Sequence, residues 1–223
     1  MLATREIEGY ARHSRAAWKR FCDDRGYRFF HCAESLLPDM HVNWSKIEMV
    51  RRHLRETAAE IVVLVDADTY VCKRDFDLNA LAEKYADKDI LFAKDCHHLG
   101  PFLLPLNFEA AFRYQTRNLP NAGFVVIRNN GFSRQFFDDW LSLSQGRLSD
   151  IADRHPRNQR VLWQGLYFQH MDRIGLLDRL VERVRNVAHI PRAIRSGAAV
   201  VHVKNGLSQQ QADELEVTLQ NNG

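Results

Sequence analysis

The 223-residue sequence contains no long hydrophobic run. Its longest apolar stretches have five or six residues, far fewer than the roughly 20 that a helix needs to cross a bilayer. The N-terminal stretch MLATREIEGYARHSR carries charges where a signal peptide needs an apolar core. We therefore expect a cytoplasmic protein without a transmembrane segment.

Cysteine is also scarce, and none of the four cysteines forms a CxxC pair. This spacing argues against a structural zinc site and against the disulfide framework of a small secreted protein. We expect Cys22, Cys32, Cys72 and Cys96 to be reduced thiols.

No cluster of basic residues accompanies the net charge of +3 and the isoelectric point of about 8.7. Lysine and arginine are spread along the chain, whereas a nucleic-acid-binding protein usually carries a basic face or stripe. We expect no nucleic-acid partner, and a small anionic ligand fits this charge distribution at least as well.

Segments typical of helices and of strands alternate along the whole chain, which predicts a single α/β domain over residues 1–223. Apolar runs predict strands at 27–32, 61–65, 89–93, 124–127 and 198–203, and helical periodicity predicts helices at about 10–25, 45–57, 78–86, 158–171 and 208–219. A further helix, rich in aromatic residues, is expected around Phe136, Phe137 and Trp140. Ser45 with Glu48, and Ser208 with Gln211, have the spacing of capping boxes. A fold of this kind should open with a strand, but Met1–Thr4 leaves room only for its last residues. The first strand therefore looks truncated, and whether the chain is part of a larger protein or assembly stays open.

The segment EIVVLVDADTYV suggests a metal site. The run Ile61–Val65 is typical of a buried, usually parallel, strand, and two carboxylates follow it, at Asp66 and Asp68. Residues i and i+2 of a strand project to the same face, so the two carboxylates should converge at the sheet edge where α/β proteins bind ligands. Their repulsion, roughly 3 kcal/mol at an effective dielectric near 20, is relieved by a hard divalent cation such as Mn²⁺ or Mg²⁺.

Two protein families combine an apolar strand with such a motif. The first motif of haloacid-dehalogenase-like phosphatases reads similarly, with the first Asp as nucleophile and the second as general acid. That family also needs a later strand that ends in Ser or Thr, a lone Lys and a distal acidic pair. The later strands here end in FVVIRNN and AVVHVKNG instead.

Four segments in order resemble GT-A-fold glycosyltransferases: HVNWSKIEMVRRHL, IVVLVDADTYV, NLPNAGFVVIRNNGFSRQFFDDW and VVHVKNG. The nearest likeness is to the family of plant xyloglucan xylosyltransferases and yeast α-galactosyl- and α-mannosyltransferases, and it covers roughly residues 10–206. The resemblance implies a GT-A, Rossmann-like fold with a mixed, mainly parallel sheet flanked by helices. Beyond it, the residue pattern predicts a C-terminal tail helix in 207–223. It also implies metal-dependent transfer of a hexosyl or pentosyl group from a nucleotide-diphosphate sugar to a glycan, lipid-linked or protein acceptor. UDP-sugars are favoured as donors, and GDP-sugars stay open.

The resemblance also assigns roles to individual residues. Asp66, Asp68 and His202 match the family's metal ligands, and Asp68 is thereby placed at the catalytic centre. Gln164 matches a position beneath the anomeric carbon, although Asn158–Gln159 is an alternative match; a glutamine there implies front-face transfer with retention. Donor-binding roles fall on Thr4, Lys46, Asp66, Asp95, Asn121, Ala122, Gly123, Lys204 and Gly206. A transferase fold that binds a glycan or a partner protein without turnover remains the non-enzymatic alternative.

Overall fold

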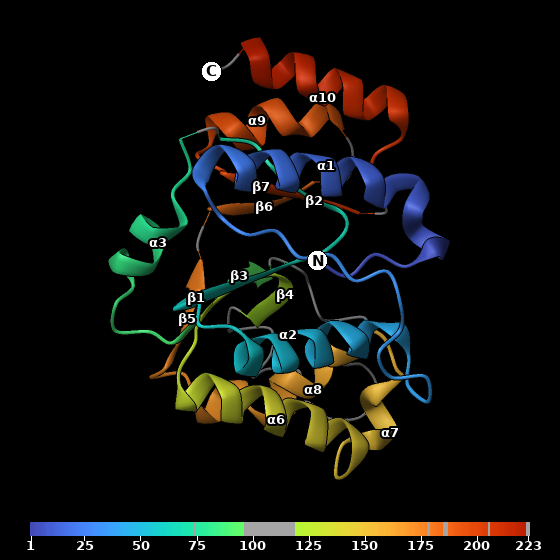
Figure 1. The fold of residues 1–223 in the computed structure, drawn as a ribbon, viewed down its shortest axis with the longest axis vertical. Helices are drawn as coiled ribbons and strands as arrows, with labels where there is room; N and C mark the ends of the chain where they lie inside the picture. The colour runs from blue at the N-terminus through green and yellow to red at the C-terminus, as the bar shows by residue number, and fades with distance from the viewer. Residues whose placement is uncertain (74, 96–118, 178, 185–186, 205, 222–223) are drawn as a thin grey trace, which may run out of the picture.

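A computed structural model describes residues 1–73, 75–95, 119–177, 179–184, 187–204 and 206–221 of the chain (Figure 1). Its longer helices are α1 (Glu8–Arg25), α2 (Ser45–Glu56), α3 (Leu78–Lys84), α6 (Gly131–Gln145), α8 (Asn158–Gly165) and α10 (Gln209–Asn221). Its shorter helices are α7 (Ser149–Ala152), α9 (Ile190–Arg195) and the 3-10 turns η1 (Arg5–Ile7), η2 (Val42–Trp44), η3 (Tyr167–Gln169) and η4 (Val187–His189). Cys96 lies outside the described residues, and the other three cysteines are free thiols.

The strands form two sheets. The first sheet has the order β1 (Ile61–Val65), β4 (Leu119–Arg128), β3 (Ile90–Asp95) and β5 (Ile174–Leu177). In it β4 runs antiparallel to both of its neighbours, while β3 and β5 are parallel. The second sheet has the order β2 (Thr69–Val71), β7 (Val200–Val203) and β6 (Val181–Val184), with β2 antiparallel and β6 parallel to β7. The expected mixed α/β fold is confirmed.

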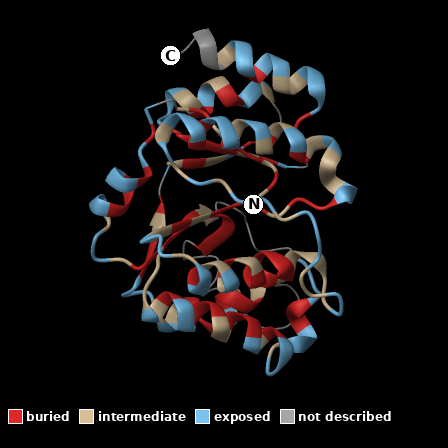
Figure 2. Ribbon diagram, viewed as in Figure 1, coloured by how far each residue is buried: buried red, intermediate tan, exposed pale blue. Residues whose placement is uncertain are grey.

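Helices cover the sheets in layers (Figure 1). One face of the first sheet packs on α2, α6 and α8, and the core there contains the fully buried Trp44, Phe136 and Trp140. The opposite face packs on α1 through Trp18 and Phe21, which also cover part of the second sheet. The helices α9 and α10 lie over the far face of the second sheet. Figure 2 shows that the buried residues concentrate between these layers.

Several helix ends follow from the sequence. Gly26 ends α1 with a left-handed backbone, φ 69°, a conformation that favours glycine. Asp77 caps α3 by accepting hydrogen bonds from Asn79 N and Ala80 N. Ser208 and Gln211 form the expected capping box at the start of α10, because each side chain accepts a hydrogen bond from the backbone N–H of the other.

The capping box expected at Ser45 is wrong. The turn η2 precedes α2, so Ser45 already lies inside the helical path, and its hydroxyl accepts a hydrogen bond from Leu36 N instead. Glu48 does not reach back to the helix start, because Arg51 and Arg52 pair with its carboxylate.

Two strand expectations and one helix expectation also need correction. Residues 27–32 form no strand, and only an isolated parallel bridge joins Leu2 to Cys32. The strand β1 pairs with β4 in the antiparallel sense, and its burial alternates, with Ile61 and Val63 only half-buried. The helix expected over 158–171 ends at Gly165, and the short strands β2, β5 and β6 lack a clear sequence signal. None of the described helices is long and apolar enough to cross a membrane.

Candidate metal and donor site

Asp66 and Asp68 lie in the turn that carries the chain from the first sheet to the second. Asp66 N donates to Gly123 O of the first sheet at 2.8 Å, and Asp68 O accepts from Val203 N of the second sheet at 2.8 Å. The strand β1 ends at Val65 and does not extend through the motif. The expectation that residues 66 and 68 share one face of a strand is therefore wrong. The two carboxylates converge because the backbone of each is anchored to a different sheet.

Thr69, the first residue of β2, fixes the shape of this turn. Its hydroxyl donates to Asp66 O at 2.7 Å, and its own carbonyl accepts from the indole N–H of Trp18 at 3.0 Å. Thr69 is fully buried, so the turn rests on the packed face of α1 and has little freedom to open.

His202 of β7 brings the third ligand to the site. It is the register partner of Thr69, and its Nε2 lies 3.0 Å from Asp68 Oδ1. Asp66, Asp68 and His202 each offer one ligand atom, and these atoms all lie within 4.8 Å of one another. The structure therefore brings together the three residues that the sequence predicts as metal ligands.

Lys46 of α2 balances the charge of Asp66. Its ammonium donates to Asp66 Oδ1 at 2.8 Å, to Asp66 Oδ2 at 3.1 Å and to Ala122 O at 3.3 Å. Lys46 is buried, with 8% of its surface exposed, so this ion pair is screened less than a surface pair would be. The predicted donor-site lysine is thus part of the carboxylate centre.

Burial and charge act in opposite directions on the other pair. Burial disfavours the charged form of Asp68, but the charge and hydrogen bond of His202 and the charge of Lys46 prevail, so the pKa of Asp68 is lowered. Burial likewise disfavours the imidazolium of His202, but the carboxylates of Asp68 and Asp66 prevail and raise its pKa. Each member of the pair favours the charged form of the other.

The donor set fits a divalent cation. Two ligand atoms on opposite sides of an ion, each about 2.1–2.2 Å away, are about 4.3 Å apart, so atoms already within 4.8 Å need little movement. Two carboxylate oxygens with one imidazole nitrogen suit Mn²⁺, and Mg²⁺ prefers oxygen ligands alone.

The segment Asn121–Gly123 contacts two residues of this centre, His202 and Lys46. Gly123 is required, because a Cβ there would lie 2.6 Å from His202 Cε1. The Asn121 side chain accepts a hydrogen bond from Gly123 N at 2.7 Å, and the Ala122 carbonyl accepts from Lys46. All three residues are buried, so their visible contribution is to position His202 and Lys46.

Lys204 and Gly206 follow His202 in the loop after β7. Lys204 is exposed and forms no ion pair with the residues that the structure describes. Gly206 has a left-handed backbone, φ 70°, and a Cβ there would lie 2.2 Å from Tyr10 Cδ2. The glycine thus lets the loop pass directly over the Tyr10 ring.

The remaining predicted residues, Thr4, Asp95 and Gln164, lie on three other elements: the N-cap of η1, the end of β3 and the helix α8. Thr4 is buried at the N-cap of η1, and its side chain lowers the pKa of the nearby Glu6. Asp95 ends β3 opposite Leu119, but its side chain lies outside the described residues. Gln164 is exposed on α8.

The alternative match at Asn158 has a structural use. Its side chain donates to Asn43 O at 3.4 Å and accepts from Gln159 N, while its carbonyl accepts from the Trp140 indole. The role beneath the anomeric carbon stays a prediction for Gln164, with Asn158–Gln159 as the alternative match.

Sequence reasoning missed Tyr10 and Arg183. Burial raises the pKa of Tyr10, and the negative charges of Asp68 and Asp66 raise it further. Arg183 of β6 is the parallel register partner of His202, so both side chains project from the same face of the second sheet. Only the alternation in VERV, residues 181–184, could have indicated the strand that carries Arg183.

No protein-family model matches this sequence, and no curated protein matches it either. Solved structures do. A glycosyltransferase involved in the glycosylation of the major capsid of PBCV-1 superposes with a TM-score of 0.66, at 14% identity over 97% of this chain and 97% of that one. The galactosyltransferase LgtC, solved with donor and acceptor sugar analogues, gives a TM-score of 0.55, at 12% identity over 99% of this chain and 94% of that one. This chain has the fold of these glycosyltransferases.

Proposed function

We propose that this chain is a metal-dependent glycosyltransferase that moves a sugar from a nucleotide-diphosphate sugar to a hydroxyl-bearing acceptor. The observation that carries the proposal is the meeting of Asp66, Asp68 and His202 at the junction of the two sheets. The fold shared with glycosyltransferases of known structure supports it. UDP-sugars are the favoured donors and GDP-sugars the alternative, while the acceptor is a glycan, a lipid-linked sugar or a protein.

The three ligand residues would hold Mn²⁺ or Mg²⁺. When bound, the cation neutralises the diphosphate and stabilises the charge that develops on it as the glycosidic bond breaks. Lys46 orients the Asp66 carboxylate through its hydrogen bonds, and Asp68 is held by His202. The protein's contribution is therefore a preorganised arrangement of charges that needs no reorganisation during transfer.

Cations beside the centre suit an anionic leaving group. Lys204 follows His202 by two residues, Arg183 is the register partner of His202 in the sheet, and both are exposed. Neither has an ion-pair partner among the described residues, so both are available to the diphosphate. Gly206 keeps the loop close to Tyr10, whose ring offers a flat apolar surface to the rest of the donor.

Gln164 is proposed as the residue beneath the anomeric carbon, and Asp95 and Thr4 as further donor contacts. An amide is a poor covalent nucleophile, so transfer would proceed on one face of the sugar, with retention. The leaving diphosphate oxygen would then accept the proton of the acceptor hydroxyl as the new glycosidic bond forms.

The first test is thermal unfolding with UDP and with GDP, each with and without Mn²⁺. A nucleotide at about 100 times its dissociation constant stabilises a protein by about 2.7 kcal/mol, which for a chain of this size is a rise of about 5–10 °C. We expect a metal-dependent rise that is absent in Asp68→Ala and retained in Asp24→Ala, a control on the exposed face of α1.

Turnover is tested by release of the nucleotide diphosphate from a panel of UDP- and GDP-sugars. Binding without release from any donor would favour a binding module over an enzyme. Hydrolysis of a simple phosphate ester that is lost in Asp66→Asn would instead favour the phosphatase alternative. No thermal shift with either nucleotide would overturn the proposal.

A further inference from the structure

The loop that follows β7, residues 204–206, is held at both ends by the segment that carries the aspartates. At the start of the loop, Val203 N donates to Asp68 O at 2.8 Å. At its end, Leu207 N donates to the phenolic oxygen of Tyr70 at 3.1 Å. Because Asp68 and Tyr70 are close neighbours in sequence, one short segment fixes both ends of the loop.

Tyr70 is a firm anchor for this bond. Its residue is 1% exposed, and its strand β2 pairs with β7 through Val201. The preceding residue, Thr69, is fixed by α1, because its carbonyl accepts hydrogen bonds from the Ser14 hydroxyl at 2.6 Å and from the Trp18 indole at 3.0 Å. Burial raises the pKa of Tyr70, so its side chain is a neutral hydroxyl near pH 7.

The bond between Leu207 and Tyr70 has no substitute in the fold. Leu207 is 1% exposed and belongs to the core that the second sheet forms with α9 and α10. No other group accepts from Leu207 N in the part of the chain that the structure describes. Without the Tyr70 hydroxyl, a buried N–H would be left unpaired, which is costly enough to displace this end of the loop.

Between its two anchors the loop rests on Tyr10. Gly206 N donates to Val203 O at 2.8 Å, and a Cβ on Gly206 would lie 2.2 Å from the Tyr10 ring. The ring blocks one direction of movement, so a loop released at Leu207 would shift away from Tyr10. Lys204, which the same loop carries, is exposed and would shift with it.

We propose that Tyr70 is a positioning residue of the donor site, whose hydroxyl fixes the loop 204–206 so that Lys204 meets the diphosphate of the donor. This inference rests on the proposed function. Because it is buried, Tyr70 contacts neither the donor nor the cation, and it acts through the backbone of Leu207.

The test is Tyr70→Phe, which keeps the ring and removes only the hydroxyl. Calorimetry measures the Kd of UDP and GDP with Mn²⁺, and of Mn²⁺ alone. We expect nucleotide binding to weaken about tenfold, the value of one buried hydrogen bond, and the Kd of Mn²⁺ alone to change less than about twofold. In turnover, KM for the donor should rise while kcat stays close to that of the parent. Amide exchange should accelerate at least about tenfold at Leu207 and stay unchanged at Val203.

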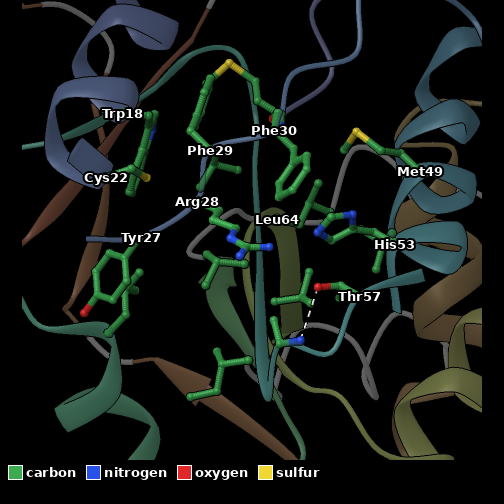
Figure 3. Close-up of a pocket in the computed structure, with 18 of the residues that line it drawn as sticks. Trp18, Cys22, Tyr27, Arg28, Phe29, Phe30, Met49, His53, Thr57 and Leu64 are labelled. Carbon is green, nitrogen blue, oxygen red and sulfur yellow. Dashed lines mark hydrogen bonds between the residues drawn. The ribbon is translucent and has the colours of Figure 1, made fainter. Parts of the chain in front are cut away.

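Two variants control for a purely structural effect. Tyr27→Phe is the matched loss of a hydroxyl, because Tyr27 borders a separate cavity (Figure 3) and donates to Asp77 Oδ1 at 3.3 Å. Leu215→Ala removes buried packing between α10 and the second sheet but keeps the Tyr70 hydroxyl. It should lower Tm, as other cavity-forming substitutions do, and weaken nucleotide binding less than about twofold.

Lys204→Ala tests the route by which Tyr70 acts. In that background Tyr70→Phe should weaken nucleotide binding less than about twofold, because both substitutions remove the same contact. Additive losses would overturn the inference, and so would parent-like nucleotide binding or parent-like Leu207 exchange in Tyr70→Phe, or an equal loss of binding in Leu215→Ala. Each of these outcomes would leave the proposed function standing. A parent chain that binds neither nucleotide with Mn²⁺ would overturn the proposed function, and the inference with it.

Discussion

Gly123 lies directly against the ring of His202, although the two residues belong to different sheets: a Cβ on Gly123 would lie 2.6 Å from His202 Cε1 and 2.8 Å from Nδ1. The imidazole fills the space that a side chain at position 123 would need. The orientation of the His202 ring therefore depends on position 123 having no side chain.

Gly123→Ala should displace His202 and remove most of the thermal shift given by nucleotide with Mn²⁺. The overlap should also destabilise the fold by about 1–3 kcal/mol, as other overpacked substitutions do. Gly9→Ala is the matched control, because a Cβ at that helical position meets nothing within 4 Å. Differential scanning fluorimetry with and without ligand measures both effects, and a Gly123→Ala variant that binds like the parent would contradict this account of His202.

Lys46→Met should destabilise the apo protein by about 1–3 kcal/mol, because it leaves the Asp66 carboxylate without its cation. Lys19→Met removes an exposed i,i+4 pair with Asp23 and should cost less than about 0.5 kcal/mol. Urea unfolding compares the two variants. Mn²⁺ should narrow the deficit of Lys46→Met and leave that of Lys19→Met unchanged, and equal responses would argue that Mn²⁺ does not reach Asp66.

Gly206→Ala should lower Tm, because the residue has φ 70° and its Cβ would overlap the Tyr10 ring. Tyr10→Ala removes the overlap but not the backbone strain. The double variant should therefore be more stable than the sum of the two single effects predicts. Additive effects in this cycle would mean that the loop after His202 does not press on Tyr10.

Asp89 should make the free energy of unfolding depend on pH. Burial raises its pKa, but hydrogen bonds from Arg173 and from Asn130, the latter at 2.5 Å, prevail, so the net effect is a lowered pKa. A depressed carboxyl contributes stability above its unfolded pKa and loses it as the pH falls through the folded pKa. Asp89→Asn should thus destabilise the protein at pH 7, with a difference that shrinks below about pH 4. Urea unfolding at several pH values measures the difference in stability between the variant and the parent, with Asp24→Asn as control. A difference that does not change with pH would contradict the lowered pKa of Asp89.

The sequence was most informative where a local signal coincided with the tertiary structure. The run Ile61–Val65 followed by two aspartates predicted the strand and the candidate metal site, because two converging carboxylates repel each other and a cation relieves that repulsion. The antiparallel pairing of β1 with β4 could not be predicted, because an apolar run does not show whether the neighbouring strand runs parallel or antiparallel to it. Tyr10 was missed for a related reason: only the folded chain brings the start of α1 over the Gly206 loop.

The turn Asp66–Asp68 makes the two sheets one thermodynamic unit. Three residues join β1 to β2, and two of the ligand residues, Asp66 and Asp68, lie in that link, whereas His202 belongs to the second sheet. The backbone of Asp66 is bonded to the first sheet and that of Asp68 to the second. A cation held there has no affinity for any state in which either sheet has opened, so it adds the same binding free energy to both opening reactions. Amide exchange should therefore slow in β5 and β6 by equal factors, although both strands lie at the far edges of their sheets.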